Sequence, residues 1–307
     1  TLSPEHKVVT LTSTSQLLDL KRYYFSVTAG LKALNGGSFN GFYNSFYTRL
    51  DSVPKFPVIS DDQLLNLIQE KCFNYFYQHA HPACGLSRER DNSGDLVTTG
   101  GSGFGVMALI VGMERGFISR DQGLPRLSKI LGFLESCDRY HGVWPHWING
   151  NTGKIIPFST NDNGADLVET SYMVQGLIAM RQYLNSANPE ELTLINRINA
   201  LNNAVEYDWF TRGQNVLYWH WSPDIGWIMN MQVRGYNETL ITYITAATST
   251  THPIAAEVYH QGYARNGGIK NGNTYSGFRL PRGEAYGGPR FFVHYSFLGL
   301  DPRQLSD

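Results

Sequence analysis

The pattern of apolar and polar positions changes about sixty residues into the chain. Before that point, short runs of β-branched and aromatic residues alternate with Gly- and Ser-rich turns. These runs predict strands at Val8–Thr12, Arg22–Thr28 and Phe42–Thr48. Three strands are too few to close a sandwich with two covered faces. Residues 1–57 are therefore predicted to be a partial β segment that ends in a linker at Asp51–Pro57.

From Ser60 onward the apolar positions follow a helical period. Ser60 and Gln63 form a capping-box pattern, and an apolar stripe runs from Leu64 to Cys72. Long loops bearing Gly, Asn and Trp separate the helical stretches, and no pattern of a parallel sheet appears. This repetition predicts an all-α domain of paired helices over residues 58–307. After the first helix, the expected helices lie near residues 101–115, 119–140, 164–184, 189–210, 236–247, 254–264 and 291–298.

Composition excludes several classes of protein. The net charge is −1 and charged residues make up 17% of the chain, so there is no electrostatic footprint for nucleic acid or an anionic membrane. No apolar run approaches the roughly 18 residues of a membrane span. The three cysteines have no paired spacing, which argues against a zinc site or a disulfide framework. The aromatic content of 13% suits a cleft that binds carbohydrate.

A glycine-rich run, Thr98–Gly105, invites comparison with a phosphate-binding loop. It lacks the Lys-Ser/Thr ending of that loop, and no apolar strand pattern precedes it. A helix start that allows close packing against a neighbour is the better interpretation.

The segment Tyr218–Tyr243 combines aromatic residues with one carboxylate at a helix start. Flat aromatic rings stack on sugar rings, and a positioned acid protonates the leaving oxygen of a glycosidic bond. Alternatively, the tryptophans are core residues and Glu238 only complements the helix dipole. For a sugar-cleaving site, Glu238 is the catalytic candidate, and the substrate-binding candidates are Trp219, His220, Trp221, Trp227, Arg234, Tyr236 and Asn237.

All six tryptophans lie between residues 144 and 227, and five of them are in predicted loops. Such clustering predicts a shared cleft lining, whereas Trp209 lies on a predicted helix and is expected in the core. The cleft candidates in the earlier loop are Trp144, His146 and Trp147. No metal site is predicted, because the i, i+4 spacing of a helical metal pair is absent among His141, His146 and His220.

Two further segments carry charged candidates. Arg88 and Asp91 lie in the loop GLSRERD, where they form either surface ion pairs or hydrogen bonds to sugar hydroxyls. Asp166 and Glu169 stand three residues apart and share one helix face. Asp166 is either catalytic or a first-turn carboxylate that satisfies backbone donors. Glu169 leads into an apolar helix face, where a carboxylate needs a partner or a function.

Six runs of the sequence carry a family resemblance: VTTGGSGFGVMALIVGMERGFISR, HGVWPHWING, GADLVETSYMVQGL, NVLYWHWSPDIGWIMN, RGYNETLITY and GGPRFFVHYSFLGLDPR. Over Asp61–Asp307 the chain resembles the glycoamylase-like bacterial domain of glycoside hydrolase family 144. The resemblance implies an (α/α)6 toroid, activity on β-1,2-glucan or sophoro-oligosaccharides, and export to the periplasm or cell surface. It also implies that Asp166, Glu169 and Glu238 act in catalysis. Residues 1–57 resemble the tail of a bacterial immunoglobulin-like module.

Two other functions stay open at this point. Related domains of cyclic β-1,2-glucan synthases favour a transglycosylase, and the tryptophans alone suit a carbohydrate-binding protein without catalysis. For hydrolysis, an inverting acid/base mechanism is expected, with Glu238 as the acid because an aromatic loop that can exclude water precedes it. Glu169 or Asp166 is expected as the base, because a helix N-terminus lowers a carboxyl pKa.

The expected partners are few. A glucan or oligosaccharide is the predicted substrate, and no cofactor, nucleic acid or membrane span is expected. The predicted helices are too few to close a toroid. A further C-terminal segment or a second chain is therefore expected to complete it.

Overall fold

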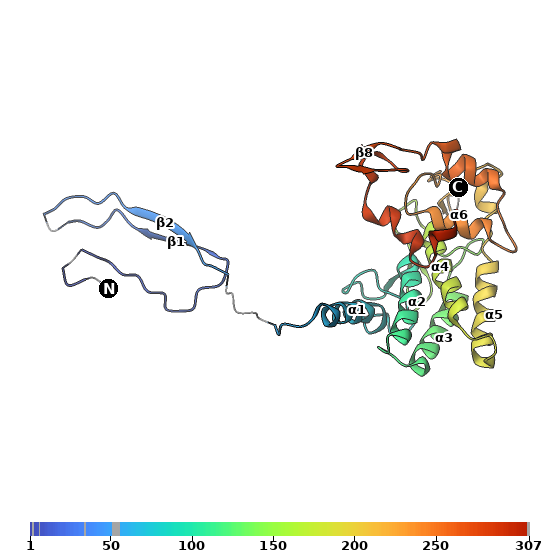
Figure 1. Ribbon diagram of the computed structural model, residues 1–307, viewed down its shortest axis with the longest axis horizontal. Helices are drawn as coiled ribbons and strands as arrows, with labels where there is room; N and C mark the ends of the chain where they lie inside the picture. Colours follow the sequence, from blue (N-terminus) through green and yellow to red (C-terminus); the bar gives the residue numbers. More distant parts are fainter. Residues whose placement is uncertain (2, 6, 34, 51–55, 306–307) are drawn as a thin grey trace. The chain divides into compact units, whose positions relative to one another are not determined.

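The computed structural model describes residues 1, 3–5, 7–33, 35–50 and 56–305. Most of the predicted linker, Asp51–Pro57, lies outside these residues. Contacts divide the chain into two compact units, Thr1–Leu64 and Leu65–Asp307 (Figure 1). The predicted boundary after residue 57 remains a prediction.

The smaller unit contains an antiparallel pair of strands, β1 (Arg22–Val27) and β2 (Phe42–Tyr47). Cross-strand aromatic pairs support the ladder, with ring centroids 5.9 Å apart for Tyr23 and Phe46. Of the strand predicted at Val8–Thr12, the described residues show one β-bridge at Val9 and no named strand, and the apolar side chains of this run are exposed. β-branched residues favour a strand only where a partner strand and a packed face are present.

The larger unit is rich in helices, which confirms the predicted all-α class at that level. The helix predicted from Ser60 is α1, and its capping box forms as expected, with Gln63 Oε1 and Ser60 Oγ each accepting a backbone N–H. Figure 1 shows α2 to α5 side by side. The α-helices are α1 (Asp61–Tyr77), α2 (Thr99–Glu114), α3 (Arg120–Ser136), α4 (Leu167–Tyr183), α5 (Pro189–Asn203) and α6 (Leu240–Ala247).

Several predicted helices are shorter than their apolar patterns. The helix predicted over residues 189–210 ends at Asn203, and only a 3-10 turn, η1 (Trp209–Thr211), follows. The one predicted over 254–264 is a single π-helical turn, η2 (Val258–Tyr263). The one near 291–298 divides into the 3-10 turns η5 (Arg290–Val293) and η6 (Tyr295–Phe297).

The loops between helices contain short antiparallel strands, which the sequence did not predict. β3 (Leu96–Thr98), β4 (Trp147–Asn149) and β5 (Ile155–Ile156) form one sheet. β6 (Ala165–Asp166) pairs with β7 (His220–Trp221). A third ribbon, β8 (Thr274–Tyr275) with β9 (Phe278–Arg279), lies near the C-terminal end. Because β3 leads directly into α2 and β6 into α4, these ribbons hold the beginnings of both helices.

Helices α2 and α4 approach each other closely through glycine. A Cβ atom on Gly103 would lie 2.3 Å from the carbonyl oxygen of Tyr172, and one on Gly176 would lie 2.2 Å from the carbonyl oxygen of Gly103. The close-packing interpretation of the run Thr98–Gly105 is therefore confirmed. Among the described residues, no helix is both long and apolar enough to cross a membrane.

Candidate active site

Asp166 is the last residue of β6 and the N-cap of α4. Its Oδ1 accepts hydrogen bonds from the backbone N–H groups of Val168 and Glu169, at 3.1 and 2.9 Å. The indole N–H of Trp219 donates to the same oxygen at 2.8 Å. The capping role weighed for Asp166 is therefore confirmed. The residue is buried. Because Oδ1 already accepts these three hydrogen bonds, the second oxygen, Oδ2, faces the other groups of the site.

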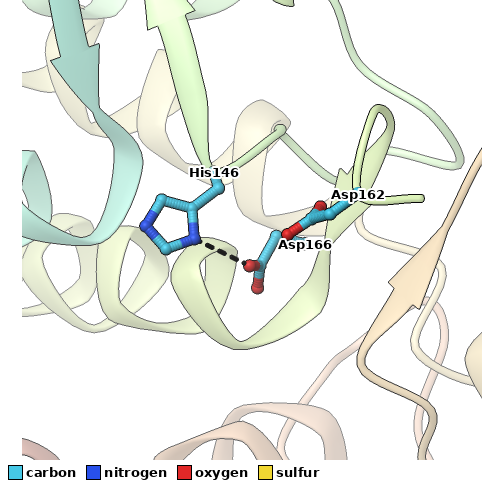
Figure 2. A group of neighbouring side chains, drawn as sticks. All are labelled: His146, Asp162 and Asp166. Carbon is cyan, nitrogen blue, oxygen red and sulfur yellow. Dashed lines mark hydrogen bonds and ion pairs between the residues drawn. The ribbon is translucent and has the colours of Figure 1, made fainter. Parts of the chain in front are cut away.

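Two histidines and a second aspartate surround that second oxygen. His146 Nδ1 lies 3.2 Å from Asp166 Oδ2, and the β6–β7 pairing brings His220 Nε2 to 3.7 Å from the same atom. Asp162 Oδ2 is 3.5 Å from His220 Nε2. Figure 2 shows His146 directed at Asp166, with Asp162 beside it.

The charges of this network shift its pKa values in opposite directions. Burial alone would raise the pKa of Asp166, but the hydrogen bond from His146 and the nearby positive charges lower it below its ordinary value. Burial opposes protonation of His146, yet its hydrogen bond to Asp166 and the charge of Glu169 raise its pKa to about 9. Burial, and next the charge of Asp166, raise the pKa of Asp162.

The same three residues offer a possible set of metal ligands. One ligand atom from each of His146, Asp162 and Asp166 lies within 4.8 Å of the others. The spacing test in the sequence considered histidines alone, and so it missed aspartates supplied by other segments. In the described residues these side chains and His220 form a network of hydrogen bonds and ion pairs. The expectation of no metal remains a prediction.

Glu169 lies in the first turn of α4 and faces the beginning of α2. Its Oε2 accepts a hydrogen bond from the backbone N–H of Gly100 at 2.9 Å, and a Cβ on Gly100 would collide with that oxygen. Burial, and next the charge of Asp166, raise the pKa of Glu169 to about 7. The expectation that the helix dipole lowers this pKa is wrong, because desolvation and a neighbouring carboxylate outweigh the dipole.

A pocket of about 280 Å³ opens beside Glu169. A second carboxylate, that of Glu89, lies on its wall, and His146 contributes an imidazole. Aromatic side chains supply much of the remaining surface, which is the composition expected of a sugar subsite. They are Tyr75, Phe76, Phe104, Tyr172 and Tyr295.

Glu238 lies just before α6, and Tyr172 connects it to this pocket. The Tyr172 hydroxyl donates to the backbone carbonyl of Glu238 at 3.2 Å, and the Ser296 hydroxyl donates to the same carbonyl at 2.8 Å. The Glu238 side chain is half-buried, and its Oε2 makes no hydrogen bond to the described residues. Burial raises the pKa of this carboxyl.

The tryptophans do not share one cleft. Trp144 is 0% exposed and donates its indole N–H to the carbonyl of Leu134, so its assignment to the cleft is wrong. Its loop packs inward because Thr170 on α4 accepts the Trp144 backbone N–H. Trp147 and Trp219 do lie beside the acids, since their indole N–H groups donate to Glu89 and Asp166.

The remaining tryptophans form a separate cluster. Trp209 lies between His141 and Trp227, with ring centroids 3.5 and 4.7 Å away. Trp221 packs edge-on against Trp209 at 5.4 Å. Contrary to prediction, Trp209 is partly exposed and lies in a 3-10 turn. Trp221 and Trp227 pack on this cluster and are not among the residues that line the pocket.

Most polar candidates hold the backbone together. Arg88 borders the pocket, but its guanidinium donates to the carbonyls of Gly94 and His79. Arg234 donates to the Gln232 side chain and the Gln261 carbonyl, and Asn237 accepts from the backbone N–H of Thr239. Asp91 is exposed, 3.8 Å from His79, and Tyr236 borders a different pocket beside α6. Sequence reasoning missed Glu89, which no pattern separates from its charged neighbours.

Comparisons with known proteins show what the chain is similar to. The Glycoamylase family model, described as "Putative glucoamylase", matches residues 230–307. The exo β-1,2-glucooligosaccharide sophorohydrolase (non-reducing end) of Parabacteroides distasonis is 41% identical over 308 residues. That match covers 94% of this chain and 42% of the relative.

Two solved structures extend the match to the fold. The endo-β-1,2-glucanase from Chitinophaga pinensis, in complex with sophorotriose and glucose, is 52% identical with a TM-score of 0.79 over 81% of this chain and 63% of that chain. The chain is similar to these β-1,2-glucan-cleaving proteins. A β-1,2-glucanase from Parabacteroides distasonis is 40% identical with a TM-score of 0.76, over 92% of this chain and 42% of that chain. The chain thus spans less than two thirds of the length of each of these relatives.

Proposed function

We propose that the protein containing this chain is a glycoside hydrolase that cleaves β-1,2-glucan or sophoro-oligosaccharides. The observation that carries the proposal is a small aromatic pocket beside Glu169, whose wall residue Tyr172 hydrogen-bonds to the backbone of Glu238. Burial raises the pKa of both carboxyls. Carboxyl groups that keep a proton in a desolvated site are the donors that glycoside cleavage needs. The named activities of the related proteins supply the substrate class.

Each of the three acids has a proposed role. Glu238 is the general acid, because its side chain is half-buried and its Oε2 is a buried oxygen with no hydrogen-bond partner among the described residues. Glu169 holds a proton below about pH 7 and donates a hydrogen bond to the substrate in the pocket. Asp166 is enclosed by donors and positions His146 and α4. The inverting route needs a carboxylate that takes a proton from the attacking water. Glu169, which is ionised above about pH 7, or Asp166 remains the predicted base, and the route itself remains a prediction from the family resemblance.

The test of the acid is Glu238→Gln in the full-length protein. General acid catalysis contributes about 10²- to 10⁴-fold, so turnover of the natural glucan should fall by at least about a hundredfold. An aryl glycoside whose leaving group needs no proton should react at a rate near that of the wild type. The exposed Glu257→Gln is the matched control and should leave both rates unchanged. Normal turnover of the natural glucan by Glu238→Gln would remove the acid role from this residue.

We propose that these helices belong to an (α/α)6 toroid. In support, α2 packs against α4 and α4 against α6, while α3 packs against α5. Alternate helices that contact each other are expected of an inner and an outer ring. We also propose export to the periplasm or cell surface, on the family resemblance, and fractionation of the cells that make the protein tests it.

A further inference from the structure

Glu89 is the carboxylate of the pocket wall for which the mechanism above has no role. Its backbone is fixed by neighbours on both sides. The Tyr75 hydroxyl lies within hydrogen-bonding distance of two carbonyls, that of Arg88 at 2.9 Å and that of Glu89 at 3.3 Å. The Arg88 guanidinium holds the same loop through the carbonyls of Gly94 and His79. The position of Glu89 is therefore set by the fold of the loop, as a binding residue requires.

The side chain of Glu89 is held at one oxygen. Trp147 donates its indole N–H to Glu89 Oε2 at 3.3 Å. The negative charge of Glu89 also contributes to the raised pKa values of Glu169 and Tyr75, although burial is the larger cause for both. Glu89 thus acts on two other groups of the same pocket. A carboxylate has about four acceptor positions, and among the described residues one side-chain hydrogen bond to it is recorded.

We propose that Glu89 is a substrate-binding residue whose carboxylate accepts hydrogen bonds from sugar hydroxyls in the pocket that it shares with Glu169. The inference rests on the proposed function, because it takes a β-1,2-linked glucose chain as the ligand. Hydroxyls are donors, and hydrogen bonds to a charged acceptor are stronger than those between neutral groups. Trp147, which orients Glu89, packs against Phe158 with the two ring centroids 4.6 Å apart, so an aromatic surface adjoins the carboxylate.

The alternative is a purely structural role, in which Glu89 only connects its loop to β4 through the hydrogen bond from Trp147. In that case its loss would lower stability and leave sugar affinity unchanged. The same loop contains a matched control, because Asp91 carries the same charge two residues away but is exposed and does not border the pocket.

The experiment measures sophorotriose binding by calorimetry in the full-length protein, with Glu238→Gln as the parent so that the ligand is not hydrolysed. Glu89→Ala should weaken binding by about ten- to a hundredfold, which is the loss expected for a hydrogen bond to a charged group. Asp91→Asn should stay within about twofold of the parent. Melting temperatures of all variants separate loss of fold from loss of binding.

Each result decides a different claim. Equal affinity of Glu89→Ala and the parent overturns the role of Glu89, as does an equal loss in Asp91→Asn. If Glu89→Ala does not fold, Glu89→Gln decides, because it keeps the size of the side chain and removes its charge. Its binding should weaken several-fold, and unchanged binding overturns the role. If the parent binds cellotriose but not sophorotriose, the proposed substrate is wrong.

Discussion

Asp166 and Glu169 stand at the same helix end, yet their pKa values move in opposite directions. Asp166 accepts two backbone N–H groups and one indole N–H, and it faces a protonated His146. Glu169 has one backbone donor, from Gly100, and lies beside the charge of Asp166. Both carboxyls are buried, so at the scale of single residues the hydrogen-bond donors and the neighbouring charges decide which of them keeps a proton.

This difference predicts how stability depends on pH. The pKa of Glu169 is near 7 in the folded chain and about 4.3 in an unfolded one, so the folded state binds the extra proton and loses stability as pH rises between these values. Glu169→Gln removes this loss and keeps an oxygen for Gly100. The melting temperature of the variant minus that of the wild type should therefore be larger by a few degrees at about pH 8 than at about pH 5. Thermal unfolding at both pH values checks this, and the same difference at both would contradict it.

At the scale of elements, the approach of α2 to α4 places Gly100 against Glu169. Gly103 and Gly176 allow that approach, because a Cβ on either would collide with backbone atoms of the opposite helix. Backbone atoms cannot rotate away as a side chain can. The glycine run of α2 therefore positions the site, and Gly100 and Gly101 also line the pocket.

Gly103→Ala should destabilise the protein by at least about 1–3 kcal/mol, the usual cost of overpacking. Gly132→Ala is the helical control, because Gly132 is exposed on α3 and its new Cβ would meet an Arg197 nitrogen at an ordinary 3.4 Å. That control should gain up to about 1 kcal/mol from helix propensity. Denaturant unfolding measures both changes. A Gly103→Ala variant as stable as the wild type would show that α2 and α4 do not pack this closely.

Local sequence patterns predicted where the helices lie better than they predicted where each helix ends. The apolar pattern of α5 continues beyond Asn203, but the chain leaves the helix to form η1. The pairing of β6 with β7 involves two residues from each segment, which is too short to produce an alternating pattern. That pairing brings His220 to Asp166, so this part of the site was not visible in the sequence. Glu89 became a candidate only when the pocket was seen.

At the scale of the whole molecule, apolar surface remains near the end of the described chain. A pocket of about 460 Å³ beside α6 is lined largely by apolar and aromatic side chains, among them Leu240, Ile244 and Phe297. Leu298 and Leu305 are more than half exposed. We propose that a further segment of the polypeptide, or a second chain, covers this surface.

The 307 residues alone should then bind a hydrophobic dye and associate in solution, because exposed apolar patches of this kind favour association. A longer form of the protein should bind less dye and remain monodisperse. Dye fluorescence together with light scattering compares the two. Monomeric, monodisperse behaviour of the 307 residues without dye binding would contradict the proposal.

The most direct test of the account is sugar release by the full-length protein from linear β-1,2-, β-1,3- and β-1,4-glucans, measured side by side. The proposed site predicts release from the β-1,2-glucan and none above background from the other two. It also predicts that Glu238→Gln abolishes this release. Equal release from all three glucans, or release from the β-1,3- or β-1,4-glucan alone, would contradict the proposed function.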